Sequence, residues 1–109
     1  MYYQVEFFCT FSGVRPVEKF INSQDQSTIS KYARLATLLS QYGPILHYPY
    51  SRKLTKNLYE LRSHGDTKIR IIYTCINQTY ILLHAFKKKT QKTPSKEIKI
   101  AEFRRLTLI

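Results

Sequence analysis

The strongest constraint on the fold is a series of three strand-like segments joined by short connections. Residues 57–62, 68–76 and 79–86 are rich in β-branched and aromatic side chains. Five residues, 63–67, separate the first two segments, and only Asn77-Gln78 separates the last two. Connections this short predict antiparallel neighbours, and therefore a three-stranded meander. The last segment is almost entirely apolar, which is typical of a central strand covered on both faces.

The first half of the chain predicts one strand followed by two helices. Residues 2–11 are rich in aromatic and branched side chains and alternate like a strand. Pro16 suits the first turn of a short helix. A second helix is predicted over residues 27–42, where apolar residues recur at steps of three and four, and a glycine–proline pair ends it. Residues 45–51 are predicted to form a loop.

A third helix is predicted near the C-terminus. Thr93 and Pro94 suit a cap and a first turn, Glu97 complements the helix dipole, and the helix extends to about Leu106. The predicted fold class is α+β: an N-terminal strand and two helices, then the three-stranded antiparallel meander and the C-terminal helix. We expect one domain of residues 1–109, with the helices on one face of the sheet and the other face open.

The positive charge is concentrated in the second half of the chain. From Arg52 to the C-terminus there are 14 Lys and Arg against 4 Asp and Glu, whereas residues 1–51 have 4 against 3. Such a localised field costs self-repulsion and is typical of proteins that bind a polyanion, so RNA or DNA is the first partner to expect. The basic residues flanking the strands are expected to form one concave, purely cationic surface: Arg52, Lys53, Arg62, Arg70, Lys87, Lys88 and Lys89.

Several other classes of protein fit the sequence poorly. No apolar run is long enough to span a membrane, and the N-terminus lacks the features of a signal peptide, so we expect a cytoplasmic protein without a membrane partner. The chain has only seven acidic residues, none of them paired at close spacing. A two-metal nuclease needs a cluster of carboxylates, so we expect neither a metal nor another cofactor.

Three motifs occur in order in the second half. They are Tyr59-Glu60-Leu61-Arg62, then Ile69-Arg70-Ile71-Ile72-Tyr73, then the run from Leu82 to Pro94, followed by Glu97-Ile98 and Ala101. As a set they closely resemble the RelE/HigB toxins of type II toxin–antitoxin systems, and within them the HigB-like, phage-derived branch. The resemblance is dense over residues 52–105, and the first half matches only in the order of its elements.

The resemblance implies an endoribonuclease that cuts messenger RNA, commonly on the ribosome, and so inhibits translation. The implied chemistry needs no metal, because the 2′-hydroxyl attacks the adjacent phosphate and leaves a cyclic phosphate and a 5′-hydroxyl. The protein must then stabilise the extra negative charge and manage two protons. The resemblance also implies a partner, a small helix-turn-helix antitoxin in the HigA style.

The resemblance assigns catalytic roles to four basic residues. Arg70 matches the arginine on the second meander strand of the family and would stabilise the transition state through a bidentate contact. The alternative is a structural arginine paired with an acid such as Glu60, and for Arg62 the two explanations are equally good. Lys87 and Lys88 are candidates to contact the phosphate or protonate the leaving oxygen, although a merely solvated lysine run is the alternative. Lys88 is expected to face opposite to its neighbours.

The remaining candidates are RNA-binding residues. They are Lys53, Arg52, Lys89, Lys92 and His84. His84 has the pKa range of a proton carrier, but a histidine in so apolar a strand is more often structural. Tyr48 and Tyr50 are candidates to stack on bases. Some relatives have lysines where this chain has Glu60, so Lys53 or one of the three consecutive lysines is the candidate substitute for a missing general base or acid.

Two alternatives to a nuclease remain open. Charge alone predicts binding and not cleavage, so a non-catalytic RNA- or DNA-binding module would use the same basic surface. An inactive remnant that survives as a protein-interaction partner is the second alternative. Substitution of Arg70 by alanine separates an enzyme from a binding module, because only an enzyme loses cleavage.

Overall fold

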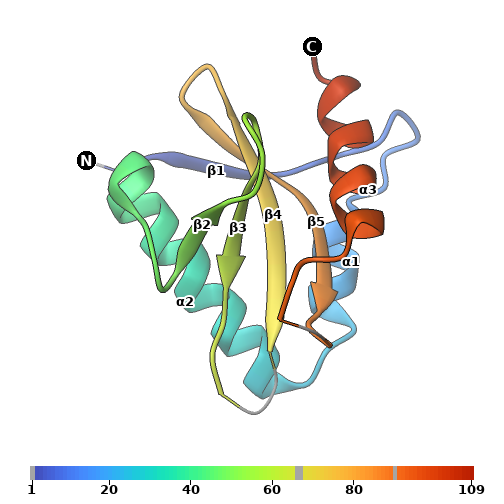
Figure 1. The fold of residues 1–109 in the computed structure, drawn as a ribbon. Helices are drawn as coiled ribbons and strands as arrows, with labels where there is room; N and C mark the ends of the chain where they lie inside the picture. Colours follow the sequence, from blue (N-terminus) through green and yellow to red (C-terminus); the bar gives the residue numbers. More distant parts are fainter. Residues whose placement is uncertain (1, 66–67, 90) are drawn as a thin grey trace.

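The computed structural model of the protein describes residues 2–65, 68–89 and 91–109. Parts of the predicted 63–67 connection and of the lysine-rich motif, residues 66, 67 and 90, lie outside the described residues. The elements are β1 (Gln4–Phe7), α1 (Pro16–Asn22), α2 (Gln26–Tyr42), the 3₁₀ turn η1 (Gly43–Ile45), β2 (Ser51–Lys53), β3 (Tyr59–Arg62), β4 (Ile69–Ile76), β5 (Thr79–Lys87) and α3 (Ser95–Leu106) (Figure 1). The α+β class is confirmed. Within the described ranges, no helix is both long and apolar enough to cross a membrane.

The strands form one mixed sheet in the order β1-β5-β4-β3-β2. Strands β3, β4 and β5 make the predicted antiparallel meander. Strand β1 joins it in parallel with β5, and in Figure 1 it runs across the view while the meander runs down it. The loop predicted over residues 45–51 runs on into β2, a strand that the sequence did not predict. Its sequence, Ser-Arg-Lys, has no pattern typical of a strand. This segment is a strand only because it pairs with β3.

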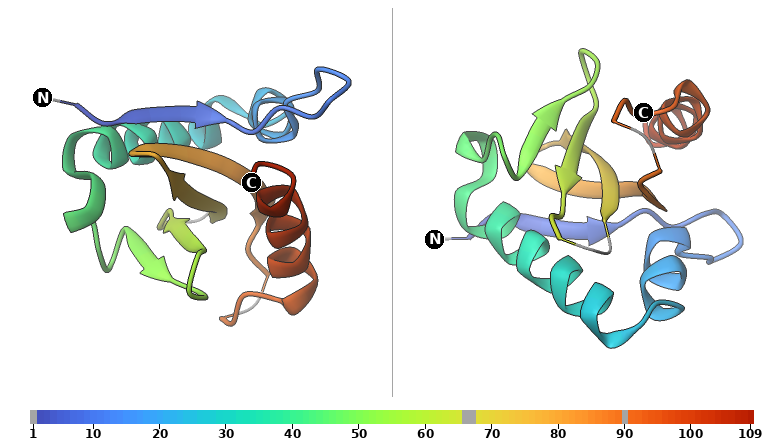
Figure 2. Two further views of the ribbon diagram at one scale, coloured as in Figure 1. Left: turned by 90° about the horizontal axis from the view of Figure 1, so that it is seen from above. Right: turned by 60° about the horizontal axis from the view of Figure 1, so that its bottom comes forward.

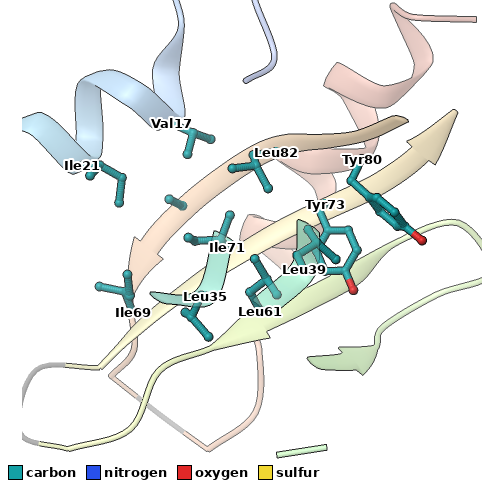
Figure 3. Packing of buried hydrophobic residues seen from close by; sticks show 11 residues of the cluster. Val17, Ile21, Leu35, Leu39, Leu61, Ile69, Ile71, Tyr73, Tyr80 and Leu82 are labelled. Carbon is teal, nitrogen blue, oxygen red and sulfur yellow. The ribbon is translucent and has the colours of Figure 1, made fainter. Parts of the chain in front are cut away.

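Helices cover both faces of the sheet, so the predicted single helical layer with an open opposite face is wrong. Helices α1 and α2 lie on one face, and α3 lies on the other, which we call the α3 face (Figure 2). Buried residues under α1 and α2 include Val17, Ile21, Leu35, Leu39, Leu61, Ile69, Ile71 and Leu82 (Figure 3). On the α3 face, Ala101 packs with Ile72, Leu83 and Phe86. Strands β4 and β5 are apolar on both sides, and both sides therefore need a cover.

Local chemistry sets the ends of α2 and the turn between β4 and β5. The side chain of Asp25 caps α2 by accepting a hydrogen bond from the backbone N–H of Thr28 at 2.9 Å. The helix ends at Gly43, whose φ of +50° is in the left-handed region. Asn77 and Gln78 both have positive φ, 50° and 67°. This conformation suits a two-residue hairpin turn, so the predicted tight corner is confirmed.

A β-bulge in β5 changes the direction in which the end of that strand presents its side chains. Leu82 and His84 pair with consecutive residues of β4, and Leu83 between them has no partner. Leu82 faces α1 and α2, and simple alternation would place Phe86 and Lys88 on the same side. Because Leu83 is an extra residue, the alternation reverses, and Phe86 instead packs on the α3 face.

Candidate functional site

A cationic pocket of about 390 Å³ lies where β4 begins and β5 ends, against the first turn of α3. Its lining residues are Arg70, Phe86, Lys87, Lys88, Lys89, Gln91, Lys92, Thr93, Pro94, Lys96 and Glu97. One arginine and five lysines thus face a single carboxylate. Five of the predicted candidates, Arg70, Lys87, Lys88, Lys89 and Lys92, are brought together here, and the excess of cations suits a phosphate group.

Arg70 is buried, with 3% of its surface exposed, yet its guanidinium lines this pocket. Its Nη1 donates hydrogen bonds to the carbonyl oxygens of Ser63 at 3.3 Å and Ile69 at 3.2 Å, and its Nε lies 3.6 Å from Oε1 of Glu60. None of the hydrogen bonds found among the described residues uses Nη2. Burial lowers the pKa of Arg70, and the nearby arginines add to this effect while Glu60 opposes it. The structure therefore contains the predicted pairing of Arg70 with an acid. Its Nη2 makes no hydrogen bond to the described residues and can donate to a ligand in the pocket.

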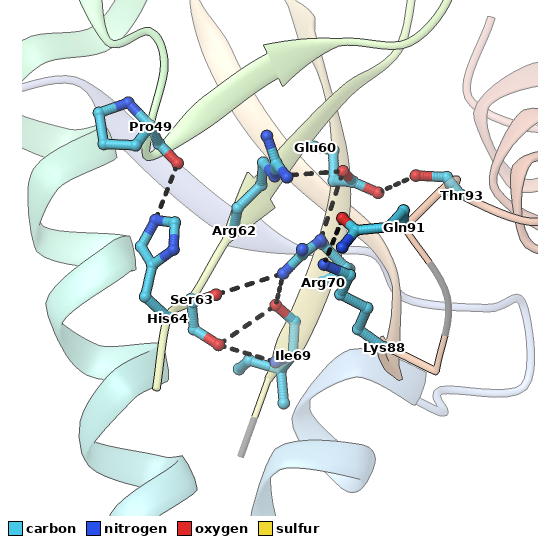
Figure 4. A network of polar contacts seen from close by, with 10 residues as sticks. All are labelled: Pro49, Glu60, Arg62, Ser63, His64, Ile69, Arg70, Lys88, Gln91 and Thr93. Atoms are coloured by element: carbon cyan, nitrogen blue, oxygen red, sulfur yellow. Dashed lines mark hydrogen bonds and ion pairs between the residues drawn. The ribbon is translucent and has the colours of Figure 1, made fainter. Parts of the chain in front are cut away.

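Glu60 lies at the centre of the basic residues, so the prediction of a purely cationic surface is wrong. Its side chain is 1% exposed, and its Oε1 lies 3.6 Å from Nε of Arg70 and 3.9 Å from Nε of Arg62. Its Oε2 accepts a hydrogen bond from the hydroxyl of Thr93 at 2.5 Å (Figure 4). A carboxylate so deep in the protein needs such partners. It holds two arginines and also ties the segment before α3 to the sheet.

The predicted cap role of Thr93 is wrong. The residue that precedes α3 is Pro94, and no side chain caps this helix. The hydroxyl of Thr93, which is buried, is turned towards Glu60 instead. A threonine–proline pair is compatible with both arrangements, and the nearby buried carboxylate decides between them.

Lys88 lies on the same side of the sheet as Arg70, because of the bulge at Leu83. Its Nζ donates a hydrogen bond to Oε1 of Gln91 at 3.3 Å, and Figure 4 shows the two side chains beside Arg70. Partial burial lowers the pKa of Lys88, and the charges of Arg70 and other cations lower it further, while Glu60 opposes the shift. A lysine with a lowered pKa is a better proton donor than a free one.

Lys53 does not line this pocket, contrary to the prediction of one common surface, whereas Lys87 borders it. Lys87 precedes Lys88 and alternates to the opposite face, although part of it borders the pocket. On that opposite face the charge of Lys87 acts on Asp25, at the start of α2. Hydrogen bonds from Thr28 lower the pKa of Asp25, and Lys87 lowers it further. Lys53 pairs with Tyr59, whose ring belongs to the core under α2, so its side chain also alternates away from Arg70.

Arg52 and Arg62 extend the cluster towards β2. Arg52 is paired with Glu60 in the β2–β3 register and thus lies on the same face. Arg62 is the register partner of Arg70, and its guanidinium lies 5.5 Å from the centre of the Tyr48 ring. Within the described part of the chain, its buried Nε has no hydrogen-bond partner. Arg62 therefore has the structural pairing with Glu60 that was one of its two explanations, but not a saturated set of contacts.

His84 is held by α3 and does not line the cationic pocket. Its Nε2 lies 2.7 Å from Oε1 of Glu97, and its Nδ1 lies 3.3 Å from Nη1 of Arg104. Because a guanidinium can only donate, Nδ1 accepts and Nε2 carries the proton donated to Glu97. Burial lowers the pKa of His84, Arg104 also lowers it, and Glu97 opposes the shift. These contacts agree with the structural role that the sequence favoured for this histidine.

Several pocket residues were not predicted as site residues. Gln91, Lys96 and Glu97 line the pocket because the segment after β5 folds back against the strand ends. Glu97 was expected only to complement the helix dipole, and no role was predicted for Gln91 or Lys96. Among residues 2–65, 68–89 and 91–109, no group of three or more His, Cys, Asp or Glu side chains is placed to hold a metal ion.

Most of the chain matches a known protein family. Residues 19–106 match the family described as "Phage derived protein Gp49-like (DUF891)". The chain belongs to this family. No curated protein matches the chain. The part of this Gp49-like protein that matches includes every residue of the cationic pocket and ends with α3, whereas β1 lies outside the match.

Proposed function

We propose that this Gp49-like protein is the toxin of a toxin–antitoxin pair and cleaves messenger RNA without a metal ion. The proposal is supported by the resemblance of its second half to RelE/HigB toxins and by membership of a phage-derived family. The observation that carries it is the position of Arg70. This arginine is held from behind by Glu60 and two carbonyl oxygens, and it lies in the same pocket as Lys88.

The proposed reaction is an internal transfer within the RNA. The 2′-hydroxyl gives its proton to solvent as its oxygen attacks the adjacent phosphorus, the bond to the 5′-oxygen of the next nucleotide breaks, and a 2′,3′-cyclic phosphate and a 5′-hydroxyl result. The phosphorane-like transition state carries extra negative charge, which Arg70 stabilises from a fixed position. Lys88, whose pKa is lowered by burial and by neighbouring cations, donates a proton to the leaving 5′-oxygen.

The other basic residues bind the substrate in this proposal. Lys89, Lys92 and Lys96 surround the mouth of the pocket and contact phosphates along the strand. The expected partners are the ribosome, where the messenger RNA is presented, and a HigA-like helix-turn-helix antitoxin. An RNA strand bound mainly by lysines is released by salt, so the affinity is expected to fall steeply with ionic strength.

The test uses purified protein, a defined RNA and excess chelator. Arg70→Lys keeps the charge but removes the planar fork, and we expect it to lower the cleavage rate roughly 100- to 1000-fold. Lys53→Gln is the matched control, because it removes an exposed charge on the opposite face, and it should leave the rate within about twofold. The ends of the products should be a cyclic phosphate and a 5′-hydroxyl.

A non-catalytic binding module would give a different result. The wild-type protein would bind the RNA but leave it intact, and removing the charge with Arg70→Ala would reduce only the salt dependence of binding, by about one unit of slope. An inactive remnant would cause no growth arrest when it is expressed alone. Either outcome would refute the proposed activity.

A further inference from the structure

A second pocket lies at the other end of the same polar cluster. It has a volume of about 260 Å³ and is bounded by α2, the end of β3 and the segment before β2. Its lining residues are Lys31, Arg34, Leu35, Tyr50, Arg62, Ser63 and His64. These described residues include three permanent cations and two rings, and none of them is acidic. The mixture of cations and aromatic rings is typical of sites that hold single-stranded nucleic acid.

The two pockets are joined through a pair of arginines. Arg62 lines the second pocket and Arg70 lines the cationic pocket, and the two are register partners on β3 and β4. The Cα atoms of directly paired residues on antiparallel strands lie only about 5 Å apart. In Figure 4 the side chains follow one another from His64 through Arg62 and Arg70 to Lys88. A single strand whose phosphate lies at Arg70 therefore reaches the second pocket within one or two nucleotides.

The second pocket has a built aromatic wall. The rings of Tyr50 and His64 meet edge to face, with centroids 6.4 Å apart and an angle of 72° between the planes. The guanidinium of Arg34 lies 5.9 Å from the centre of the Tyr50 ring. Nε2 of His64 lies 3.2 Å from the carbonyl oxygen of Pro49. Because a carbonyl only accepts, this nitrogen carries the proton, and the hydrogen bond fixes the orientation of the ring.

We propose that this pocket binds the nucleotide that flanks the scissile phosphate, with its base against Tyr50 and His64 and its phosphate against Arg34 and Arg62. The inference rests on the proposed function for the position of the cut. What the inference adds is a binding site for a base, in a pocket other than the one that Arg70 and Lys88 line. A cavity of this size holds one base and not a base pair, so the RNA must be single-stranded where it enters.

The test is a double-mutant cycle between the protein and the RNA. The probe is a fluorescein-labelled RNA hexamer with 2′-O-methyl groups, which cannot be cleaved, and a series of hexamers with an abasic site at each position in turn. The protein variant is Arg34→Gln/His64→Gln, which alters two exposed side chains and should fold normally. Lys53→Gln is the matched control, because it removes the same charge outside both pockets.

We expect one abasic position to weaken binding to the wild-type protein roughly tenfold to a hundredfold, which is the contribution of a stacked base. In the double variant the same abasic position should have a clearly smaller effect, since His64, one of the two rings that the base contacts, has been removed. The Lys53→Gln control should show the full abasic effect. Dissociation constants come from fluorescence anisotropy at fixed salt.

The possible outcomes separate this inference from the proposed function. If the abasic effect is equally large in the double variant and in the wild type, the base lies elsewhere and the inference is wrong, whether or not the protein cleaves RNA. If the coupling is found but natural RNA remains intact, the binding site stands and only the nuclease activity fails. If the wild-type protein does not bind the hexamer at all, the inference is overturned, and the proposed function is then judged by the cleavage assay alone.

Discussion

Replacing Glu60 by glutamine removes one negative charge from the centre of the cationic cluster and changes little else. The substitution keeps the shape of the side chain, and a glutamine oxygen still accepts the hydrogen bond from Thr93. The other oxygen becomes an NH₂ group, which is a donor. This donor then faces the Nε groups of Arg62 and Arg70, which are also donors, so both arginines lose their counter-charge in a buried site.

The magnitude follows from the two distances. At 3.6 Å and 3.9 Å, and with an effective dielectric constant of about 20, each attraction is worth about 4 to 5 kcal/mol. Removing the carboxylate also removes the cost of burying it, which is several kcal/mol. Breaking one partner of a buried pair typically costs about 3 to 5 kcal/mol of unfolding free energy, and we expect Glu60→Gln to fall in this range.

The assay is urea unfolding at pH 7, followed by the cleavage rate under conditions where the variant is folded. Because Arg70 loses the contact to its Nε, we expect the maximal rate to fall about tenfold or more, with a smaller change in KM. Glu102→Gln is the matched control, since it makes the same change in a partly exposed pair at the surface, Glu102 with Arg105. Surface pairs of this kind contribute only about 0 to 1 kcal/mol.

Two results would refute the reasoning about Glu60. One is a Glu60→Gln variant whose unfolding free energy lies within about 1 kcal/mol of the wild type, because the buried pairs would then contribute nothing net. The other is a full cleavage rate in a folded variant. That result would mean that Arg70 keeps its position without the carboxylate.

Three further predictions concern pH and packing. Since the pKa of Lys88 is lowered by burial and neighbouring cations, the alkaline limb of the pH–rate profile should lie below that of a free lysine, about 10.4, and Arg62→Gln should move it upwards. The pKa of His84 in the folded protein lies below the ordinary value of a histidine, about 6.5, because the ring is buried, so the unfolded chain binds the extra proton. Stability measured by urea unfolding should therefore decrease as the pH falls below 6.5, and less so in His84→Gln. Gly43→Ala should lower the free energy of unfolding by about 1 to 3 kcal/mol and the melting temperature with it, because φ is positive there and the new Cβ would lie 2.5 Å from the ring of Tyr3.

The meander and α2 could be predicted because their signals are local. Periodicity identifies α2, and the two-residue corner at Asn77-Gln78 leaves only an antiparallel partner for the next strand. The same short connections place Arg62 and Arg70 side by side on neighbouring strands. A site built on adjacent strands of a hairpin is accessible to such reasoning, since register follows from the turn.

The contacts between distant segments could not be predicted. Nothing in the composition of β1 indicates a parallel partner in β5, and β2 becomes a strand only through its pairing with β3. The contact between Glu60 and Thr93 joins residues 33 positions apart. The sequence shows a carboxylate among cations and a threonine before a proline, and each has a local explanation that is complete without the other.

The bulge at Leu83 limits the prediction of the site most directly. Strand alternation predicts that Lys88 faces opposite to Lys87, and the structure agrees. One extra residue in the strand decides whether Lys87 or Lys88 lies on the same side of the sheet as Arg70. A bulge inside an apolar run has no signature in the sequence. The sequence alone therefore does not show which of Lys87 and Lys88 lies beside Arg70.

Residues of β4, of the end of β5 and of α3 line the cationic pocket. The buried carboxylate of Glu60 accepts a hydrogen bond from Thr93, in the segment leading into α3. During synthesis, Arg62 and Arg70 are therefore made well before the groups that complete their surroundings. A chain interrupted between Lys88 and α3 would have both arginines but would lack the wall of the pocket that α3 supplies. A frameshift in that interval should thus abolish the proposed cleavage, although Arg70 and Lys88 remain unchanged.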